Sequence, residues 1–367
     1  MIRNNKKISW WMPKVGNTEL KLIKKVIDKN YVNQGNLTEI LENKISNILG
    51  VKYVVMTTSG TVALFLALKS LGVGYGDEVI VPDITYIATA NAVTLCGANV
   101  VLADVGEDLL LDPQIFENKI TEHTKAVIPV HISGRSVSMK IILDIAKKHN
   151  IYVVEDAAEA FFSKKNGKYL GTFGNAGAFS LSPNKIITSG QGGFVVTDDH
   201  NLYIRLKQLR NQGSENKLSG GDDVHQTIGF NFKFTDLQAA VALGQLKQLN
   251  TRVKRMIRNN ELYRTKLENL KGISVFNCDT KKGELPLWTD VLVEDRDGLD
   301  NYLKDRNIDC RRFWFPIHWN KNYQKLDFEF PISTKLNPKS LWLPSAFNLK
   351  DSDIEIVVKY IKEFISK

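Results

Sequence analysis

The sequence has few cysteines, and they form no recognisable pattern. Cys96, Cys278 and Cys310 are odd in number and far apart, which excludes a disulfide framework and a cysteine-based zinc site. The six histidines also lack the spacing of metal ligands, so we expect no metal. These absences leave a fold that is stabilised by its apolar core.

Long apolar segments are also missing. No run approaches the roughly 20 apolar residues that span a bilayer. The polar, basic residues 1–7 are not followed by the apolar core of a signal peptide. We therefore expect a soluble, cytoplasmic protein without a membrane partner. With 367 residues, 43% of them hydrophobic and 24% charged, the chain is long enough for two globular domains.

Positive charge is in excess, with 49 Lys and Arg against 40 Asp and Glu and a formal net charge of +9. The densest run, residues 252–258, also has the apolar spacing of a helix. This favours a solvated helix face over nucleic-acid binding. An anionic small substrate fits the excess equally well, so charge by itself selects no function.

Short apolar segments alternate with amphipathic ones between about residues 37 and 200. This alternation predicts an α/β fold with a mostly parallel sheet that helices cover on both faces. The predicted strands are 53–57, 78–81, 100–103, 126–130 and 152–154, and the predicted helices are 62–71, 88–96 and 139–149. Ligands of such sheets bind beyond the carboxyl ends of the strands, where we expect the functional residues.

The remaining pattern continues this domain and then indicates a smaller α+β domain. An exposed loop is predicted over 212–225, and Thr235 and Asp236 are predicted capping residues. We place the large domain at 1–249 and the small one at 250–367. The further predicted elements are strands at 194–196, 273–276 and 288–293 and helices near 202–211, 235–249 and 252–270.

Lys185 and Asp156 carry the clearest chemical signals. Lys185 lies between an apolar segment and a glycine-rich turn, and partial burial of this kind helps a lysine to lose its proton for covalent catalysis. Asp156 ends a predicted strand, and two alanines follow it. A buried carboxylate there can keep a pyridine nitrogen protonated, although helix capping also explains an aspartate at this position.

Other residues suggest a phosphate site and a ring-binding site. Gly60 and Thr61 follow Ser59 at a predicted helix start, where free N–H groups bind anions, although ordinary capping explains them too. Ser180 offers a further hydroxyl for the same phosphate. Tyr86, beyond the next strand, could stack on a pyridine ring or belong to the core.

Nearly the whole chain, from residue 33 to 345, resembles the DegT/StrS family of nucleotide-sugar aminotransferases. The matching segments are 59–64, 76–82, 155–159, the segment around Lys185, 229–233 and 236–240. The resemblance implies the aspartate-aminotransferase-like (type I) fold. It also implies pyridoxal 5'-phosphate (PLP) as the cofactor, with pyridoxamine phosphate as an intermediate form.

The resemblance also implies a role for each matching residue. Lys185 would bind the cofactor covalently and move protons, Asp156 would pair with the pyridine nitrogen, and Tyr86 would stack on the ring. Glu159 would contact the cofactor near its hydroxyl. The implied phosphate ligands are Gly60, Thr61, Ser180 and, from the partner subunit of a homodimer, Asn231. The residues implied to border the sugar are Arg311, Pro316 and His318.

The implied reaction transfers an amino group from glutamate to a keto nucleotide sugar, and the most similar family members act on a 4-keto-6-deoxy sugar. The implied product would enter O-antigen or another surface polysaccharide. Glu159 and Asn184-Lys185 resemble members that make 4-amino-4,6-dideoxy sugars such as perosamine. Ser133, Arg135, Gln191 and the Cys310-Arg311-Arg312 run depart from the usual residues, and these departures bear on the substrate.

Three other functions remain open at this point. A sugar 3-dehydratase of the same fold has histidine in place of the cofactor lysine, so Lys185 argues against it. A keto-cyclitol aminotransferase would differ only in its acceptor. A non-catalytic protein that binds PLP or a nucleotide sugar is disfavoured by the presence of both Lys185 and Asp156.

Overall fold

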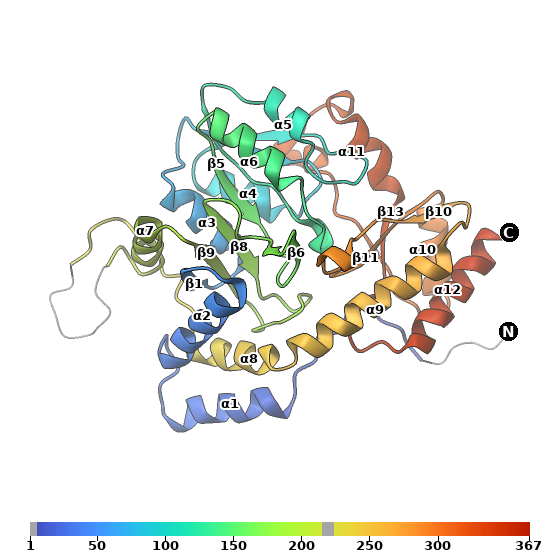
Figure 1. Cartoon of the computed structure of the whole chain (residues 1–367), viewed down its shortest axis with the longest axis horizontal. Helices are drawn as coiled ribbons and strands as arrows, with labels where there is room; N and C mark the ends of the chain where they lie inside the picture. The colour runs from blue at the N-terminus through green and yellow to red at the C-terminus, as the bar shows by residue number, and fades with distance from the viewer. Residues whose placement is uncertain (1–5, 215–223) are drawn as a thin grey trace.

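The structure is a computed structural model that describes residues 6–214 and 224–367. It contains two main sheets, each packed against its own helices (Figure 1). The part of the predicted 212–225 loop that spans 215–223 lies outside the described residues. In the described part, none of the helices combines the length and apolar character that crossing a membrane requires.

The larger sheet has seven strands in the order β1-β9-β8-β5-β4-β2-β3. Only β9 runs antiparallel to its neighbours, β1 and β8, so the sheet is mostly parallel as predicted. The strands are β1 (Tyr53–Thr57), β2 (Glu78–Pro82), β3 (Asn99–Ala103), β4 (Thr124–Val127), β5 (Tyr152–Asp156), β8 (Ala176–Ser180) and β9 (Gly193–Thr197).

Helices cover both faces of this sheet. One apolar cluster joins the sheet to α2, α6 and α8, and a second joins it to α3, α4 and α7. Burial on both faces explains why the strands are almost continuously apolar. The helices are α1 (Asn17–Asp28), α2 (Asn36–Leu49), α3 (Gly60–Ser70), α4 (Ala88–Leu95), α5 (Pro113–Asn118), α6 (Met139–Lys148), α7 (His200–Arg210) and α8 (Asp236–Leu246).

The smaller sheet is antiparallel throughout, in the order β10-β11-β13-β12. α9 (Leu249–Leu267) runs from α8 to this sheet, and we propose the domain boundary after residue 249 because α9 begins there (Figure 1). The remaining elements are β10 (Ile273–Val275), β11 (Thr289–Val293), β12 (Arg311–Arg312), β13 (Ser340–Leu343), α10 (Arg296–Lys304), α11 (Pro331–Leu336) and α12 (Asp351–Ile365), with a small hairpin of β6 (Lys164–Lys165) and β7 (Lys168–Tyr169).

Several elements differ from the prediction. β8 was not predicted, because its sequence Ala-Gly-Ala-Phe-Ser has little β propensity. Gly177 is nevertheless required there, since a Cβ atom would lie 1.9 Å from the carbonyl oxygen of Gly171. α1 and α2 were also missed, and β4 ends at Val127, before the predicted residue 130.

The two predicted capping residues at the start of α8 act on different helices. Thr235 accepts a hydrogen bond from the N–H of Gln238 and caps α8, as predicted. Asp236 instead accepts from the N–H groups of Leu37 and Thr38 at the start of α2. The prediction was wrong for Asp236, because its partner lies about 200 residues away in the sequence.

Candidate active site

The predicted cofactor residues gather at the carboxyl ends of the parallel strands. Asp156 ends β5 and Ser180 ends β8, while Gly60 begins α3 directly after β1. Lys185 follows β8 in the turn that leads back to β9. The sheet therefore brings together residues that are up to 125 positions apart in the chain.

Asp156 is a buried carboxylate to which no described cation hydrogen-bonds. It is 6% exposed. One oxygen accepts a hydrogen bond from the Thr89 hydroxyl (2.8 Å) and the other from the Ala158 N–H (3.1 Å). Burial raises the pKa of Asp156, opposed by the Thr89 bond. No helix follows Asp156, which rules out helix capping, and no described cation hydrogen-bonds to it.

Lys185 places its amine in a shielded position. Its side chain is 11% exposed, and Nζ donates to Oε1 of Glu159 at 3.1 Å. The amine also lies 5.0 Å from the centre of the Trp288 ring. The second oxygen of Glu159 accepts from the backbone N–H of Ser133 (3.0 Å). Burial raises the pKa of Glu159, and the positive charge of Lys185 opposes this rise.

The start of α3 packs closely against β8 and β9. The hydroxyl of Ser59 accepts from the N–H of Val62, so the helix begins as predicted. A Cβ atom on Gly60 would lie 2.9 Å from Cβ of Ser180, and one on Gly193 would lie 2.5 Å from the carbonyl oxygen of Ser59. The hydroxyls of Ser180 and Ser182 are hydrogen-bonded to each other at 3.0 Å beside this helix start.

These groups fit PLP. The phosphate would meet N–H groups at a helix start and two serine hydroxyls, which suit an anion. A protonated ring nitrogen would supply the hydrogen-bonded cation that buried Asp156 lacks, and the Lys185 amine lies among partly buried groups as covalent binding requires.

Two predicted cofactor residues, Tyr86 and Asn231, are exposed. Tyr86 is 54% exposed, with its ring centre 6.4 Å from that of Trp314, so it does not belong to the core. Asn231 is exposed and forms an isolated bridge with Asn211. Neither residue hydrogen-bonds to Lys185 or Asp156 in the described chain.

The three predicted sugar-site residues lie in different surroundings. Arg311 is exposed on β12, with its guanidinium 4.9 Å from the centre of the Trp10 ring. Pro316 is buried before a 3₁₀ turn at Ile317–Trp319. His318 is fully buried, its Nδ1 2.7 Å from Asp83 and its Nε2 3.2 Å from Asp327. Both ring nitrogens of His318 are thus hydrogen-bonded within the protein.

Sequence reasoning missed Thr89 and Trp288. Thr89 lies near the start of α4 and hydrogen-bonds to Thr85 as well as to Asp156. Because Asn91 and Thr94 are polar residues of the same helix, the sequence did not single Thr89 out. Trp288 lies more than 100 residues after Lys185, and only the packing of the two sheets brings its ring to the amine.

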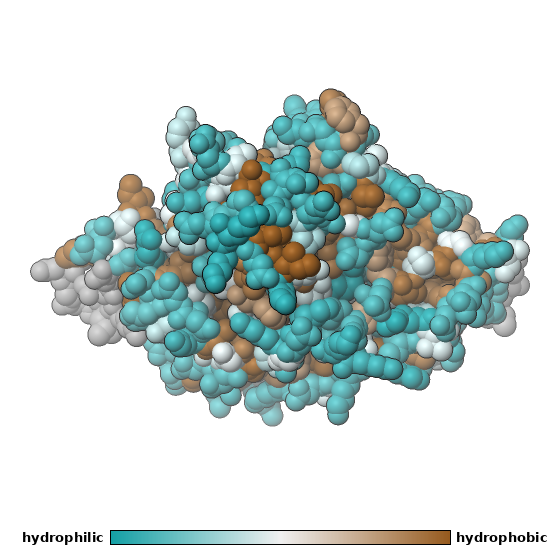
Figure 2. Space-filling model, turned by 45° about the horizontal axis from the view of Figure 1, so that its top comes forward, coloured by the Kyte–Doolittle hydropathy of each residue, from teal (hydrophilic) through white to brown (hydrophobic). Residues whose placement is uncertain are grey.

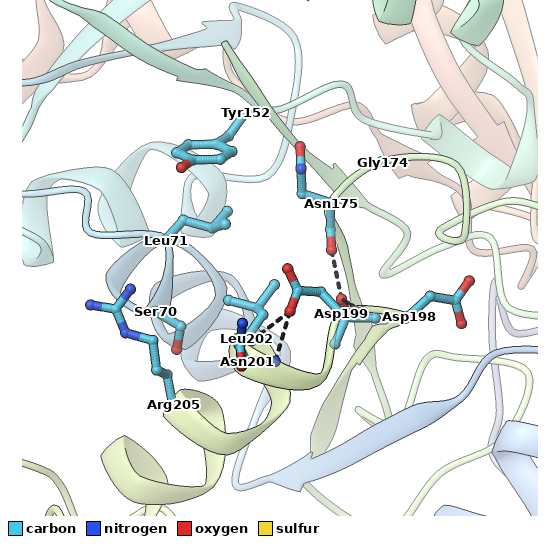
Figure 3. A pocket seen from close by; sticks show the side chains of 11 residues that line it. Ser70, Leu71, Tyr152, Gly174, Asn175, Asp198, Asp199, Asn201, Leu202 and Arg205 are labelled. Carbon is cyan, nitrogen blue, oxygen red and sulfur yellow. Dashed lines mark hydrogen bonds between the residues drawn. The ribbon is translucent and has the colours of Figure 1, made fainter. Parts of the chain in front are cut away.

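A hollow at the opposite ends of the strands of the large sheet is separate from this site (Figure 3). Tyr152 at the start of β5 and Thr197 at the end of β9 line it, together with Arg205 of α7. Asp156 and Ser180 lie at the other ends of β5 and β8. The groups that fit the cofactor are therefore at the edge where parallel sheets bind ligands.

Comparison with known proteins agrees with this arrangement. The chain belongs to the DegT/DnrJ/EryC1/StrS aminotransferase family, whose model matches residues 13–362. It is 35% identical to the GDP-perosamine synthase of Escherichia coli O157:H7, over 98% of this chain and 99% of that protein. It is 31% identical to the spore coat polysaccharide biosynthesis protein SpsC of Bacillus subtilis (strain 168), over 99% and 98%.

A solved structure extends the likeness to three dimensions. DesV of S. venezuelae, in complex with a ketimine intermediate, matches with a TM-score of 0.90 and 32% identity, over 95% of this chain and 94% of that one. The predictions of family, type I fold, aminotransferase class and PLP as cofactor are thus confirmed.

Proposed function

We propose that this aminotransferase moves an amino group from glutamate to a 4-keto-6-deoxy nucleotide sugar, in the cytoplasm, for a surface polysaccharide such as an O-antigen. The observation that carries the proposal is the Lys185 amine held 3.1 Å from Glu159 at the strand ends that also bear buried Asp156. The names of the E. coli and B. subtilis relatives favour the nucleotide sugar and the polysaccharide.

Each residue of the site has a proposed task. PLP, when bound, supplies an electron sink for a substrate carbon that loses a proton. Lys185 would hold the cofactor and then move the proton, while Glu159 orients the amine from 3.1 Å. Asp156 would keep the ring nitrogen protonated. The start of α3 (Gly60 and Thr61) and Ser180 would bind the phosphate.

Exposed aromatic side chains are suited to the sugar nucleotide. Tyr86 and Phe315 are exposed, and Trp314 lies beside Tyr86. We propose that Tyr86 stacks on the cofactor ring and that Arg311 and Pro316 border the substrate. His318 would act indirectly, because its bonds to Asp83 hold the segment that carries Pro316 against the loop after β2.

We also propose a homodimer in which Asn231 completes the partner's phosphate site. Asn231 is exposed, and the segment before it leaves Ile228 88% and Val224 50% exposed. Apolar surface of this kind is typical of a segment that a second chain covers. Figure 2 shows one face of the molecule, where hydrophobic patches lie within a mostly hydrophilic surface.

An absorbance experiment tests the proposed function. We expect the PLP-loaded protein to absorb near ~420 nm, and glutamate to shift this band to ~330 nm as the cofactor takes the amino group. Keto nucleotide sugars and keto-cyclitols would then be tested for their ability to restore the first band. Lys185→Ala should lose the first band and all turnover.

The outcomes separate the rival functions. Restoration by cyclitols alone would replace the sugar with a cyclitol as the acceptor. A stable band that no amino donor changes would point to PLP chemistry other than transamination or to a binding protein. Normal turnover by Lys185→Ala would overturn the assignment of the lysine.

A further inference from the structure

Ser133 occupies an unusual backbone conformation beside the lysine. It lies in the 3₁₀ turn Ile132–Gly134 after β4, with φ 51° and ψ 25°, and it is 1% exposed. This left-handed region is unfavourable for residues with a side chain other than Asn or Asp. A buried serine keeps such a conformation only when its surroundings hold it there.

Three hydrogen bonds hold Ser133. Its N–H donates to Oε2 of Glu159 (3.0 Å), and its carbonyl oxygen accepts from the N–H of Leu287 (3.0 Å). Its hydroxyl donates to Oδ1 of Asp290 at 2.7 Å. Ser133 therefore connects Glu159, the partner of Lys185, to β11 of the small sheet and to the segment just before it.

Asp290 is itself fixed by Arg135. Asp290 lies on β11 and is 3% exposed, and its second oxygen accepts from Nε of Arg135 at 3.1 Å. Arg135 also donates to the carbonyl oxygen of Asp108 (2.6 Å) and lies 4.8 Å from the centre of the Phe276 ring. The guanidinium of Arg135 is thus anchored by both Asp290 and the Asp108 carbonyl oxygen.

The neighbouring glycine limits how the turn can move. Gly134 has φ 83°, and a Cβ atom there would lie 1.9 Å from the carbonyl oxygen of Leu285. The turn therefore packs directly against segment 285–290, which leads into β11. Because Ser133 bonds to both Asp290 and Glu159, we expect a change in the Ser133–Asp290 contact to shift Glu159 as well.

We propose that Ser133 is a positioning residue that, anchored by Asp290 and Arg135, fixes Glu159 and through it the Lys185 amine. One oxygen of Glu159 binds Ser133 and the other faces Lys185, so the serine N–H sets the orientation of the carboxylate. The inference rests on the proposed role of Lys185. It assigns a task to Ser133 and Arg135, two of the residues that depart from the family pattern.

The test measures the reactivity of Lys185 in the cofactor-free protein. Acetic anhydride at pH 8 labels free amines, and peptide mass spectrometry gives the rate at Lys185 relative to exposed lysines. Ser133→Ala removes the hydroxyl that bonds to Asp290 but leaves a side chain in the unfavourable left-handed conformation. The turn should therefore relax, and its N–H should no longer hold the carboxylate of Glu159. We expect labelling of Lys185 to accelerate at least about threefold, because the ammonium loses its carboxylate partner.

Further variants separate positioning from a general loss of structure. Asp290→Asn should accelerate labelling like Ser133→Ala, and Glu159→Gln should set the upper limit. Ser133→Gly should have a smaller effect, because glycine adopts the left-handed conformation without strain. Glu42→Gln is the matched control, since Glu42 also accepts from a buried arginine, Arg210, but does not contact the lysine. It should label like the wild type.

Unchanged labelling in folded Ser133→Ala and Asp290→Asn would overturn the proposal, and so would unchanged labelling in Glu159→Gln. If Asp290→Asn fails to fold, Ser133→Ala and Ser133→Gly decide the matter. The labelling needs no cofactor. A failure here is therefore distinct from failure of the proposed function, which would appear as a Lys185→Ala protein that keeps its ~420 nm band.

Discussion

At the scale of single residues, Asp156 shows how the site is built at a cost to the fold. Its carboxylate is buried with two neutral hydrogen-bond donors, and burial raises its pKa. A buried carboxylate without a cation destabilises a protein. Such a residue is typical of a functional site that gains its counter-charge from a ligand.

We therefore expect Asp156→Asn to lower the activity and to raise the free energy of unfolding of the cofactor-free protein. The rate of the glutamate half-reaction should fall by at least about 100-fold, because a neutral amide does not keep the ring nitrogen protonated. The folded pKa of Asp156 lies above its unfolded pKa, so the free energy of unfolding falls as the pH rises from the unfolded to the folded pKa. At pH values above the folded pKa, the charged carboxylate lowers the free energy of unfolding by its full amount.

Urea unfolding of the cofactor-free protein checks the sign. At pH 8 the Asp156→Asn variant should be more stable than the wild type. The difference should shrink as the pH falls toward about 4, the ordinary pKa of an aspartate. A less stable variant at pH 8 would show that the carboxylate contributes to the fold even without the cofactor.

At the scale of elements, α2 and α8 are joined through one carboxylate. Asp236, the first residue of α8, accepts from the N–H groups of Gly35, Leu37 and Thr38 and from the Thr38 hydroxyl. These groups lie at the start of α2, where N–H groups have no partner within the helix. The cap therefore also fixes how the two helices pack.

Asp236→Ala should lower the free energy of unfolding by about 2–3 kcal/mol, because several buried donors lose their acceptor. Thr235→Ala, which removes only the cap of α8, should cost about 1 kcal/mol. Urea titrations with equal slopes give both values. Equal losses in the two variants would mean that Asp236 does not link the helices.

At the scale of the whole molecule, the proposed dimer makes two sites that each use both chains. Lys185→Ala inactivates the site in its own chain, because that chain's lysine holds the cofactor. Asn231→Asp would instead act on the partner's site, where its negative charge repels the phosphate. A mixed dimer of the two variants has one site with both changes and one site with neither. The inactive variants should therefore complement each other.

Mixing equal amounts of Lys185→Ala and Asn231→Asp, followed by subunit exchange, should restore about one quarter of the wild-type activity at limiting PLP. Half of the dimers are then mixed, and each has one intact site. Each variant alone is the control. No recovery, despite exchange shown by mass labelling, would place Asn231 in the site of its own chain.

The sequence by itself determined the fold class and the positions that meet at the strand ends. Strand and helix periodicity depend on residues close together in the chain, so β1, β5 and α3 were predicted within a few residues. The likeness of the Lys185 and Asp156 segments to the family indicated the cofactor.

Only the tertiary structure decided the partners of the buried polar groups. Asp236 with α2, His318 with Asp83 and Ser133 with Asp290 are each separated by more than 150 residues. β8 forms because its neighbours bury it and not because its small residues favour a strand. Such pairings depend on which strands and helices become adjacent, and short-range patterns carry no record of that adjacency.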